Sequence, residues 1–475
     1  MEGGSMSDYA NLCRLRAYET GTALALGSQR HAPISEAALL ITPLLAAGEN
    51  PSLFAIGVAQ VDGPLQVFTC ANPPDRNAQY AMLLQFALAV IPTITWWDTD
   101  PAVMPQLIFP SDAAMNVGLA NIYRMAYAQD PHLQQVGRAL MGMYRRNGRA
   151  DNAAIVSVVN LVNRHFAVGT DELAASHLGV LEQWLLPADG QIHQRVRLAE
   201  VQPAGAATDP ALDRNVLEPL LKSYRAASST GNAGHAKTVA AKLVLALEPE
   251  VRRLHTMALG VLARVNAISQ SDRAQAMARG ERAEFDRHMA HVATNAPVSS
   301  GFNGNQSVIE YLSRSLAQAE HEVSTMREAG RERVEARLAG ESLHGIITAR
   351  RETKAGARTY IDIEVQTPQP RLKMRSGKEL ELLSGAYPWV FTVTNVQMSP
   401  NGPLVTLRMK EGMTKTGQPV VGDSVELAPT QHFSRRIKNA TIRLATQAPR
   451  PVVSSPSMGG TDFLAVIASL KGITP

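Results

Sequence analysis

The residues closest to a known chemical motif form a glycine-rich segment, Gly231–Thr238, with the sequence GNAGHAKT. It is similar to a phosphate-binding P-loop, in which glycine directly precedes the lysine because the backbone must curl around the phosphate. Here Ala236 occupies that position, and the residues before the segment have helical spacing where a P-loop needs a strand. The sequence therefore favours a loop that caps a helix beginning at Ala236 over a nucleotide site.

Two histidines and two tryptophans are further candidates for chemistry. His288 and His291 are three residues apart, a spacing that can present two metal ligands on one helix. No cysteine lies near them in the sequence, so solvated histidines on an amphipathic helix are the better interpretation. Trp96 and Trp97 are adjacent, and paired indoles more often bury core or interface area than bind a ligand. We predict no metal, no cofactor and no catalytic residue.

Positive charge is concentrated near the C-terminus. Residues 343–445 contain 15 Lys and Arg against 8 Asp and Glu, whereas the whole chain has 46 and 42. Cationic side chains neutralise phosphates, so a local basic field favours a polyanion such as nucleic acid as the ligand. The candidate nucleic-acid-binding residues are Arg350, Arg351, Lys354, Arg358, Arg371, Lys373, Arg375, Lys378, Arg435, Arg436 and Lys438.

Aromatic side chains in the same region offer faces on which bases could stack. They are Tyr360, Tyr387, Trp389 and Phe391. Aromatic residues stack bases without sequence preference. The alternative is that these aromatics form a core, and that Lys and Arg protect strand edges from aggregation. Two further alternatives are that these basic residues face an acidic protein surface, or that they face only solvent.

Composition and cysteine usage indicate a soluble cytoplasmic protein. The chain is 45% hydrophobic and 19% charged, which is ordinary for a globular protein. The longest apolar run, Tyr80–Ile94, is shorter than the roughly 18 residues that span a bilayer, and we interpret it as a buried helix. Cys13 and Cys70 come without a secretory signal, which predicts two reduced, buried thiols.

A small mixed α/β region is predicted for the N-terminal part of the chain. Helical spacing predicts helices at Asp8–Thr20, Ile34–Ala47 and Arg76–Val90. Strands are predicted at Leu53–Val61, Leu65–Cys70, Thr93–Trp97 and Gln106–Phe109. The turn Asp62-Gly63 joins the first two strands as a hairpin, because glycine accepts the positive φ of such turns.

The spacing of apolar residues predicts a series of helices in the middle of the chain. A Pro-, Gly- and Ala-rich connection, Pro187–Asp209, separates two helical stretches and indicates a domain boundary. Asp272–Ala293 and Gln306–Leu338 each carry one apolar stripe. Because each stripe needs a cover, these two helices are predicted to form an antiparallel hairpin.

Period-2 alternation replaces helical spacing from Leu343 onward. Strands are predicted at Leu343–Arg351, Arg358–Val365, Tyr387–Val396, Leu404–Lys410 and Ser424–Leu427. Five short strands in this length are typical of a small barrel. The predicted fold is therefore multidomain α+β: mainly helical, with a small N-terminal α/β region and a C-terminal five-stranded OB/SH3-like β-barrel.

Four segments are predicted. Residues 1–186 form a mixed α/β and then helical domain, and residues 187–342 form a helical domain that ends in the hairpin. Residues 343–430 form the basic barrel, and residues 431–475 contain a basic helix, a linker and a docking helix. The predicted partner-docking face of that last helix consists of Phe463, Leu464, Ile467 and Leu470.

The order of helical hairpin, small barrel and basic helix across residues 272–445 resembles the accessory stalk and barrel of UPF1-like superfamily 1 helicases. In that family the barrel touches the nucleic-acid strand ahead of a motor with an intact P-loop. No motor sequence follows the barrel here, so the resemblance implies binding and not ATP hydrolysis or unwinding.

These observations support three hypotheses about function. The first is a non-enzymatic nucleic-acid-binding subunit of a bacterial protein complex, which works with a separate motor or nuclease. The second is an oligomerising scaffold or assembly protein whose barrel contacts protein. The third is an enzyme whose site has no recognisable motif.

Overall fold

The computed structural model describes residues 8–46, 52–187, 189–295, 330–355, 358–383, 389–411 and 416–429, with 298, 307, 310–315, 317, 318, 321 and 326. The predicted basic helix and docking helix lie outside these residues. The same holds for their candidate residues Arg435, Arg436, Lys438, Phe463, Leu464, Ile467 and Leu470.

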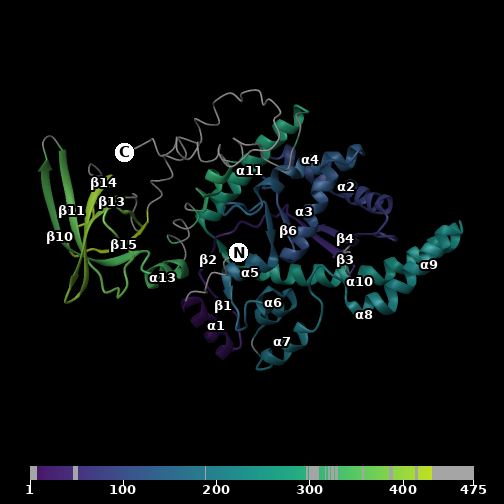
Figure 1. Cartoon of the computed structure of the whole chain (residues 1–475), viewed down its shortest axis with the longest axis horizontal. Helices are drawn as coiled ribbons and strands as arrows, with labels where there is room; N and C mark the ends of the chain where they lie inside the picture. Colours follow the sequence, from purple (N-terminus) through teal and green to yellow (C-terminus); the bar gives the residue numbers. More distant parts are fainter. Residues whose placement is uncertain are drawn as a thin grey trace, which may run out of the picture.

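A five-stranded mixed sheet forms the centre of the N-terminal body, in the order β5-β4-β3-β6-β7 (Figure 1). Its strands are β3 (Leu39–Leu45), β4 (Leu53–Gln60), β5 (Gln66–Thr69), β6 (Leu107–Phe109) and β7 (Ile155–Ser157). β3, β6 and β7 run parallel to one another, and β4 runs antiparallel to β3 and β5. The chain thus builds β4 and β5 on one side of β3 and later adds β6 and β7 on the other side.

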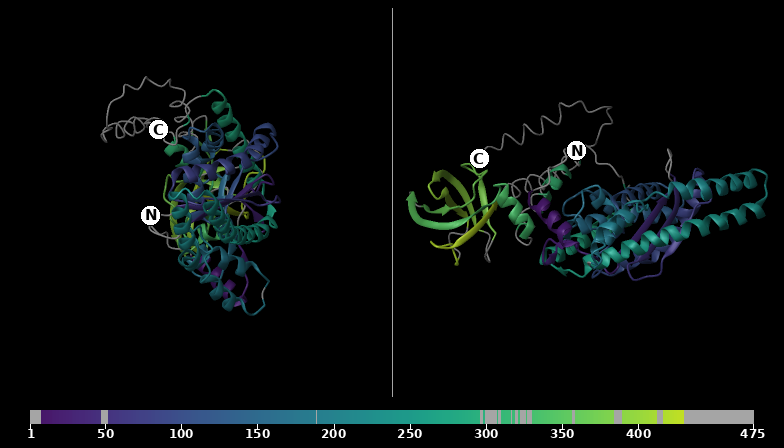
Figure 2. Two further views of the ribbon diagram at one scale, coloured as in Figure 1. Left: turned by 90° about the vertical axis from the view of Figure 1, so that its right-hand side faces the viewer. Right: turned by 90° about the horizontal axis from the view of Figure 1, so that it is seen from below.

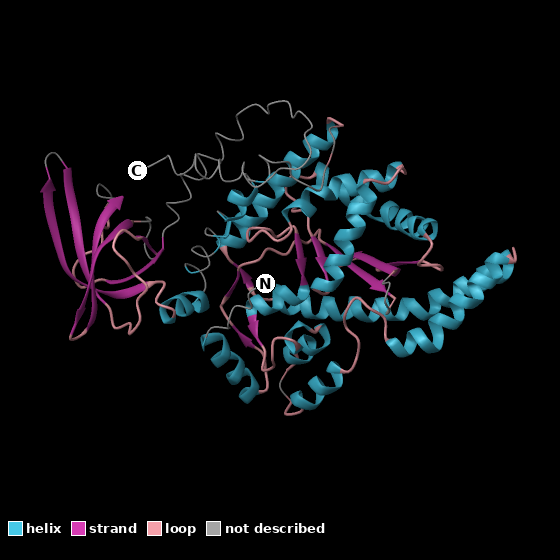
Figure 3. Ribbon diagram, in the orientation of Figure 1, coloured by secondary structure: helices cyan, strands magenta, loops and turns pink. Residues whose placement is uncertain are grey.

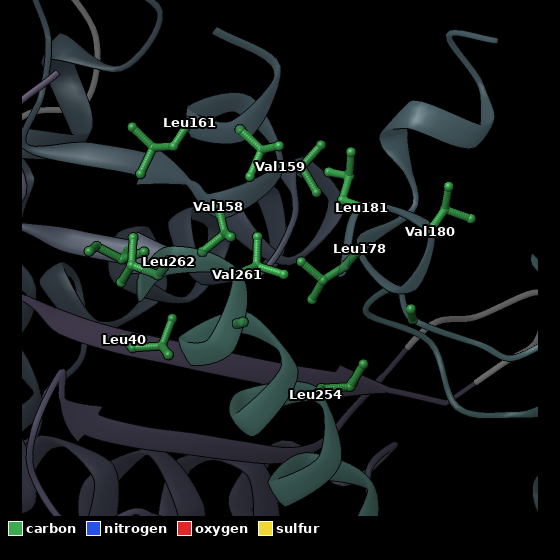
Figure 4. Close-up of a cluster of buried hydrophobic side chains, with 14 of the residues drawn as sticks. Leu40, Val158, Val159, Leu161, Leu178, Val180, Leu181, Leu254, Val261 and Leu262 are labelled. Carbon is green, nitrogen blue, oxygen red and sulfur yellow. The ribbon is translucent and has the colours of Figure 1, made fainter. Parts of the chain in front are cut away.

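Helices cover both faces of this sheet. On one face, Leu39 and Ile41 of β3 pack in a cluster with α2 (Arg76–Thr99), α3 (Asp112–Ala126) and α4 (Pro131–Arg146). On the other face, Leu40 and Leu44 pack with three further helices (Figure 4). These helices are α5 (Val158–His165), α6 (Leu178–Leu185) and α10 (Ala233–Asn266). A strand that is buried on both faces is a nearly continuous apolar run, which explains the sequence LLITPLL of β3. Its one polar residue, Thr42, lies 3.1 Å from Nδ1 of His255.

The prediction of a helix at Ile34–Ala47 was wrong, because this segment contains β3, the middle strand of the sheet. A short apolar run without alternation does not distinguish a buried strand from a buried helix. The strand predicted at Thr93–Trp97 was also wrong, since these residues extend α2 through Pro92. The strands at Leu53–Val61, Leu65–Cys70 and Gln106–Phe109 are confirmed as β4, β5 and β6 within a few residues.

One hydrophobic cluster joins residues from both sides of the Pro- and Gly-rich connection. It contains Leu178 and Trp184 before the connection, and Leu243, Leu254 and others on α10 after it. α10 is a single helix despite Pro249, and its buried stripe lies on the N-terminal sheet. The predicted boundary at residue 187 remains a prediction about domains, but the apolar core is continuous across that position.

The remaining elements extend this body. They are α1 (Asp8–Thr20), η1 (Ala174–Ser176), α7 (Ile192–Glu200), α8 (Pro210–Leu212), η2 (Asp213–Leu217), α9 (Glu218–Ser229), α11 (Asp272–Ala293) and α13 (Gly330–Leu338). Two small two-stranded sheets pair β1 (Leu24–Ala25) with β8 (Phe166–Ala167) and β2 (Gln29–Arg30) with β9 (Ser269–Gln270). α9 and the first part of α10 form a helical hairpin that projects from the body (Figure 2). α11 confirms the first helix of the predicted antiparallel pair, whereas most of residues 306–329 lie outside the described part of the chain.

The C-terminal part is a closed antiparallel barrel of six strands (Figure 3). They are β10 (Leu343–Ala355), β11 (Arg358–Gln366), β12 (Glu379–Leu382), β13 (Val390–Ser399), β14 (Gly402–Glu411) and β15 (Ser424–Pro429). The barrel order is β10-β11-β14-β13-β12-β15, and β15 closes it by pairing with β10. The sequence analysis missed β12, because a strand of four residues is shorter than usual and follows a polar loop.

Cys13 and Cys70 are buried and free, as predicted, and burial raises the pKa of Cys70 to about 11. Among the described helices, α2 is the one that is long and apolar enough to cross a membrane by length and composition. It packs in the core cluster with Met82, Phe86 and Trp97, as expected of a buried helix.

Candidate nucleic-acid interface and ligand cavities

In the β10–β11 hairpin, the two basic residues whose side chains the structure describes, Arg350 and Arg351, each have an acidic neighbour. Arg350 contacts the Glu352 carboxylate at 3.1 Å and also donates to Gln418. Arg351 is 71% exposed, and its guanidinium lies 3.2 Å from Glu364 on β11. Lys354 and Arg358 lie at the end of the same hairpin, where Lys354 is opposite Thr359 and Ala355 is opposite Arg358 in the strand pairing.

The neighbouring strand continues this balanced pattern. Arg408 on β14 makes two hydrogen bonds to Asp362 on β11, at 2.8 and 3.0 Å. Its guanidinium also lies 5.0 Å from the centre of the Tyr360 ring. Lys410 pairs with Glu379 on β12. The outer surface of β11 and β14 therefore offers alternating charges rather than a continuous positive face.

The loop between β11 and β12 presents the candidate cations differently. Arg371 and Arg375 are exposed, and among the described residues neither makes an ion pair. Lys373 contacts Glu341 at 3.1 Å, and burial lowers the pKa of Lys378. Arg371 and Arg375 therefore differ from Arg350, Arg351 and Lys373, each of which has an acidic partner among the described residues.

This loop is held against the end of α13, which lies between the body and the barrel (Figures 1 and 2). The Lys373 amide donates to the Gly340 carbonyl at 2.8 Å. Gly340 has φ +71°, and a Cβ there would lie 2.8 Å from the Arg371 carbonyl oxygen, so only glycine fits. On the same helix, Arg337 contacts Glu426 of β15 at 2.6 Å. These contacts fix the basic loop relative to both α13 and the barrel.

The predicted aromatic stacking surface is mostly absent from the described part of the barrel. Trp389 and Phe391 are 4% and 0% exposed and belong to the barrel core, so their assignment as stacking faces was wrong. Tyr360 remains half-buried beneath Arg408. Tyr387 lies outside the described residues. The alternative interpretation, that barrel aromatics fill the core, is thus confirmed for two of the four.

Gly231–Thr238 is the tip of the α9–α10 hairpin, which confirms the capping interpretation. Gly231 takes φ +71° in the turn, and the side chain of Asn232 accepts from the His235 amide at 3.0 Å as the N-cap. α10 begins at Ala233, three residues earlier than predicted, so Lys237 lies inside the helix. A helix, α9, also precedes the turn, where a P-loop has a strand.

His288 and His291 line a cavity of about 380 Å³ between α4 and α11, together with several arginines. Nε2 of His288 lies 2.7 Å from the Arg138 carbonyl and 3.1 Å from the Gly142 amide, which places this histidine in a structural contact. In the described residues no group of three or more His, Cys, Asp or Glu could hold a metal ion.

The charges of this cavity compensate one another. Glu281 is 3% exposed, and its carboxylate accepts from Arg146 at 2.9 Å and from the Ala153 amide at 2.7 Å. Burial raises the pKa of Glu281, while Arg146 opposes that shift. Arg149 pairs with Asp151 at 3.0 Å. This arrangement ties α11 to α4 and to the start of β7, and we interpret it as structural.

A second cavity, which the sequence analysis missed, has a volume of about 590 Å³ and lies at one edge of the central sheet. We call it the sheet-edge cavity. Its lining residues are Ser111, Asp112, Ala113, Val159, Asp171, Leu173, Ala174, Ser176, His177, Glu200, Ala204 and Gly205. A sequence signal for this cavity was Ser111-Asp112, a helix start that follows the predicted strand Gln106–Phe109 after Pro110.

Asp112 is held by two neighbours from α5 and its N-cap. Its Oδ1 accepts from Ser157 Oγ at 2.5 Å and from Asn160 Nδ2 at 2.7 Å. Ser111 caps α3 through the Ala114 amide, which places Asp112 in the first turn of the helix. The carboxylate therefore has a fixed position at the carboxyl ends of β6 and β7.

A scan against protein-family models gives no match to this chain, and a search of curated proteins gives none either.

Proposed function

We propose that this protein is a non-enzymatic nucleic-acid-binding subunit that works in the cytoplasm with a separate motor or nuclease. The observation that supports the proposal best is a pair of exposed arginines, Arg371 and Arg375, on the loop between β11 and β12, which form no ion pair with any residue that the structure describes. Free guanidinium groups bind phosphate oxygens in bidentate geometry and release counterions. The barrel acts in this proposal as an OB/SH3-like binding module.

The barrel residues contribute unequally in this proposal. To bind phosphate, Arg351 must break its ion pair with Glu364, and Arg408 must break its ion pair with Asp362. The loss of these ion pairs reduces the net contribution of both arginines to the binding free energy. Arg371 and Arg375 have no ion pair within the described part of the chain that phosphate binding would break. The loop is also fixed by Lys373 and Gly340, so little conformational entropy is lost when a strand binds.

Replacing both loop arginines tests this function. The double variant Arg371→Glu, Arg375→Glu is expected to bind a 20-nucleotide single strand at least about tenfold more weakly at moderate salt, and to reduce the salt slope by about 0.7 for each lost phosphate contact. Fluorescence anisotropy across a salt series with DNA and RNA strands measures both quantities.

The matched control makes the same change of charge far from the barrel. Lys222→Glu, Lys237→Glu alters two exposed lysines on the α9–α10 hairpin. This control should bind like the unmodified protein. Equal losses in both variants, or unchanged binding in the loop variant, would remove the loop as the interface.

The alternative is an oligomerising scaffold, and one surface favours it. Leu12 and Leu15 on α1 are each 61% exposed, and Tyr18 on the same side of the helix is 55% exposed. In this alternative a second copy of the chain covers the stripe. Light scattering should then show a multiple of the monomer mass that falls to the monomer in Leu12→Glu, Leu15→Glu. A monomer without any substitution would contradict the alternative.

A further inference from the structure

The sheet-edge cavity lies where ligands bind in open α/β sheets. The chain leaves β3 toward β4 and β5 on one side and returns through α2 to β6 and β7 on the other. Crevices outside the carboxyl ends of parallel strands at such a reversal are common ligand sites. In the lining, Ser111 follows β6 and Val159 follows β7. Ala204 and Gly205 also line the cavity, and the next residue, Ala206, accepts a hydrogen bond from the Leu45 amide of β3.

The size and surface of the cavity suit a small organic molecule. Its volume of about 590 Å³ falls within the range of sites for drug-sized ligands. Val159, Ala113 and Ala204 give it an apolar wall. Leu173, which also lines it, is 84% exposed, so a bound apolar group would remove this side chain from water.

The charge of the lining defines the class of ligand. Its described residues include the exposed carboxylates of Asp112, Asp171 and Glu200 and no Lys or Arg. His177 adds no positive charge, because its Nδ1 accepts from the Val180 amide at 3.3 Å and its Nε2–H can donate to the Gln202 carbonyl at 3.0 Å. Burial also lowers the pKa of His177.

Asp112 is already positioned for recognition. Ser157 and Asn160 both donate to Oδ1, and a carboxylate has lone pairs on both oxygens. With respect to the described residues, Oδ2 is therefore available to a second donor. Arg164 on α5 is the cation near Asp112, but it is not part of the lining. A donor that enters the cavity therefore meets a carboxylate whose orientation is fixed by Ser157 and Asn160.

We propose that the sheet-edge cavity binds a small organic cation, with an ammonium or guanidinium group at Asp112 and an apolar body against Val159 and Leu173. The site is separate from the proposed nucleic-acid interface and does not depend on it. Its ligand need not react, because the lining offers recognition of charge and shape alone.

Isothermal titration of the full chain with 2-phenylethylamine tests the site, with 2-phenylethanol as the uncharged analogue of equal size and spermidine as a cation without an apolar ring. We expect the amine to bind at least about tenfold more tightly than the alcohol. Asp112→Asn and Glu200→Gln together should remove most of this preference. Leu173→Ala should weaken the amine while leaving the preference for charge.

Two control variants keep the outcome interpretable. Glu248→Gln changes a partly exposed carboxylate that is paired with Arg252 on α10, and it should leave amine binding unchanged. Arg371→Glu, Arg375→Glu should also leave it unchanged, whatever that variant does to nucleic-acid binding. Glu200→Gln alone alters an exposed side chain and provides a test if Asp112→Asn unfolds. Equal binding of amine and alcohol, no binding of any probe, or full binding by the carboxylate variants would overturn the proposal.

Discussion

Lowering the pH from 7 to 4 should reduce the free energy of unfolding by about 3 kcal/mol for each of two buried histidines, His165 and His255. Burial lowers the pKa of each to about 4 from the ordinary value of 6.5. Above pH 6.5 both imidazoles are neutral in the folded and the unfolded chain. Below it the unfolded chain takes up protons that the folded chain cannot bind until about pH 4, so stability falls.

The surroundings of His165 favour its neutral form. It is 4% exposed, its Nδ1–H donates to the Leu161 carbonyl at 2.7 Å, and its Nε2 accepts from the His31 amide at 3.1 Å. Protonation of Nε2 would break the contact with His31. Arg30 and Arg164 lie nearby and also oppose a positive charge.

His255 is neutral for a related reason. It lies on α10 against the central strand, 3% exposed, with Nδ1 at 3.1 Å from the Thr42 hydroxyl. Its Nε2 is buried without a hydrogen-bond partner, so a proton there would have no acceptor. Arg252 adds to the unfavourable field.

Urea unfolding between pH 4.5 and 7.5 measures this effect. His165→Asn and His255→Asn should each flatten the pH dependence by up to about 1.4 kcal/mol per pH unit below pH 6.5. His235→Asn, at the exposed tip of α10, is the control and should leave the slope unchanged. Parallel curves for all the proteins would show that neither buried histidine governs acid stability.

Trp97→Ala should lower the free energy of unfolding by about 3–5 kcal/mol, as expected when a large buried aromatic is removed from a core. Trp97 is 0% exposed, donates from Nε1 to the Ala37 carbonyl at 3.0 Å, and meets Phe285 of α11 edge-on at 6.2 Å. Arg282 of α11 also donates to its carbonyl oxygen. The substitution therefore leaves a cavity and removes a contact between α2 and α11.

The adjacent tryptophan provides the matched control. Trp96 is 39% exposed, and its Nε1 donates to Asp100 at 3.3 Å, so Trp96→Ala should cost less than about 1 kcal/mol. Denaturant unfolding of both variants compares the two positions. Similar losses would mean that the core does not depend on the indole of Trp97.

Several local features were predictable from the sequence, because their causes are local. The cap at Asn232 and the turn at Gly231 follow from short-range backbone chemistry, which excluded the P-loop. The five predicted barrel strands show the alternation that a one-sided core imposes, and all five are present. The burial of Trp97 and of the two cysteines follows from their apolar character.

The central sheet could not be derived in this way. β3 is buried by helices on both faces, so its sequence lacks alternation and was interpreted as a helix. β12 has four residues, too few to define a period, and pairing with β13 and β15 decides its conformation. Whether a segment is a strand in these cases depends on neighbours that are distant in the chain.

The candidate sites were also determined partly by the sequence and partly by the tertiary structure. Sequence alone determined that residues 343–445 carry the excess of Lys and Arg. Only the tertiary structure decided which of these cations are neutralised, because Arg408 meets Asp362 across two strands that are 46 residues apart in the chain. It also placed Asp112 beside Ser157 and Asn160, since parallel strands bring their carboxyl ends to one edge of the sheet. The excess of positive charge follows from the amino-acid composition of residues 343–445, whereas a binding site depends on contacts between residues that only folding brings together.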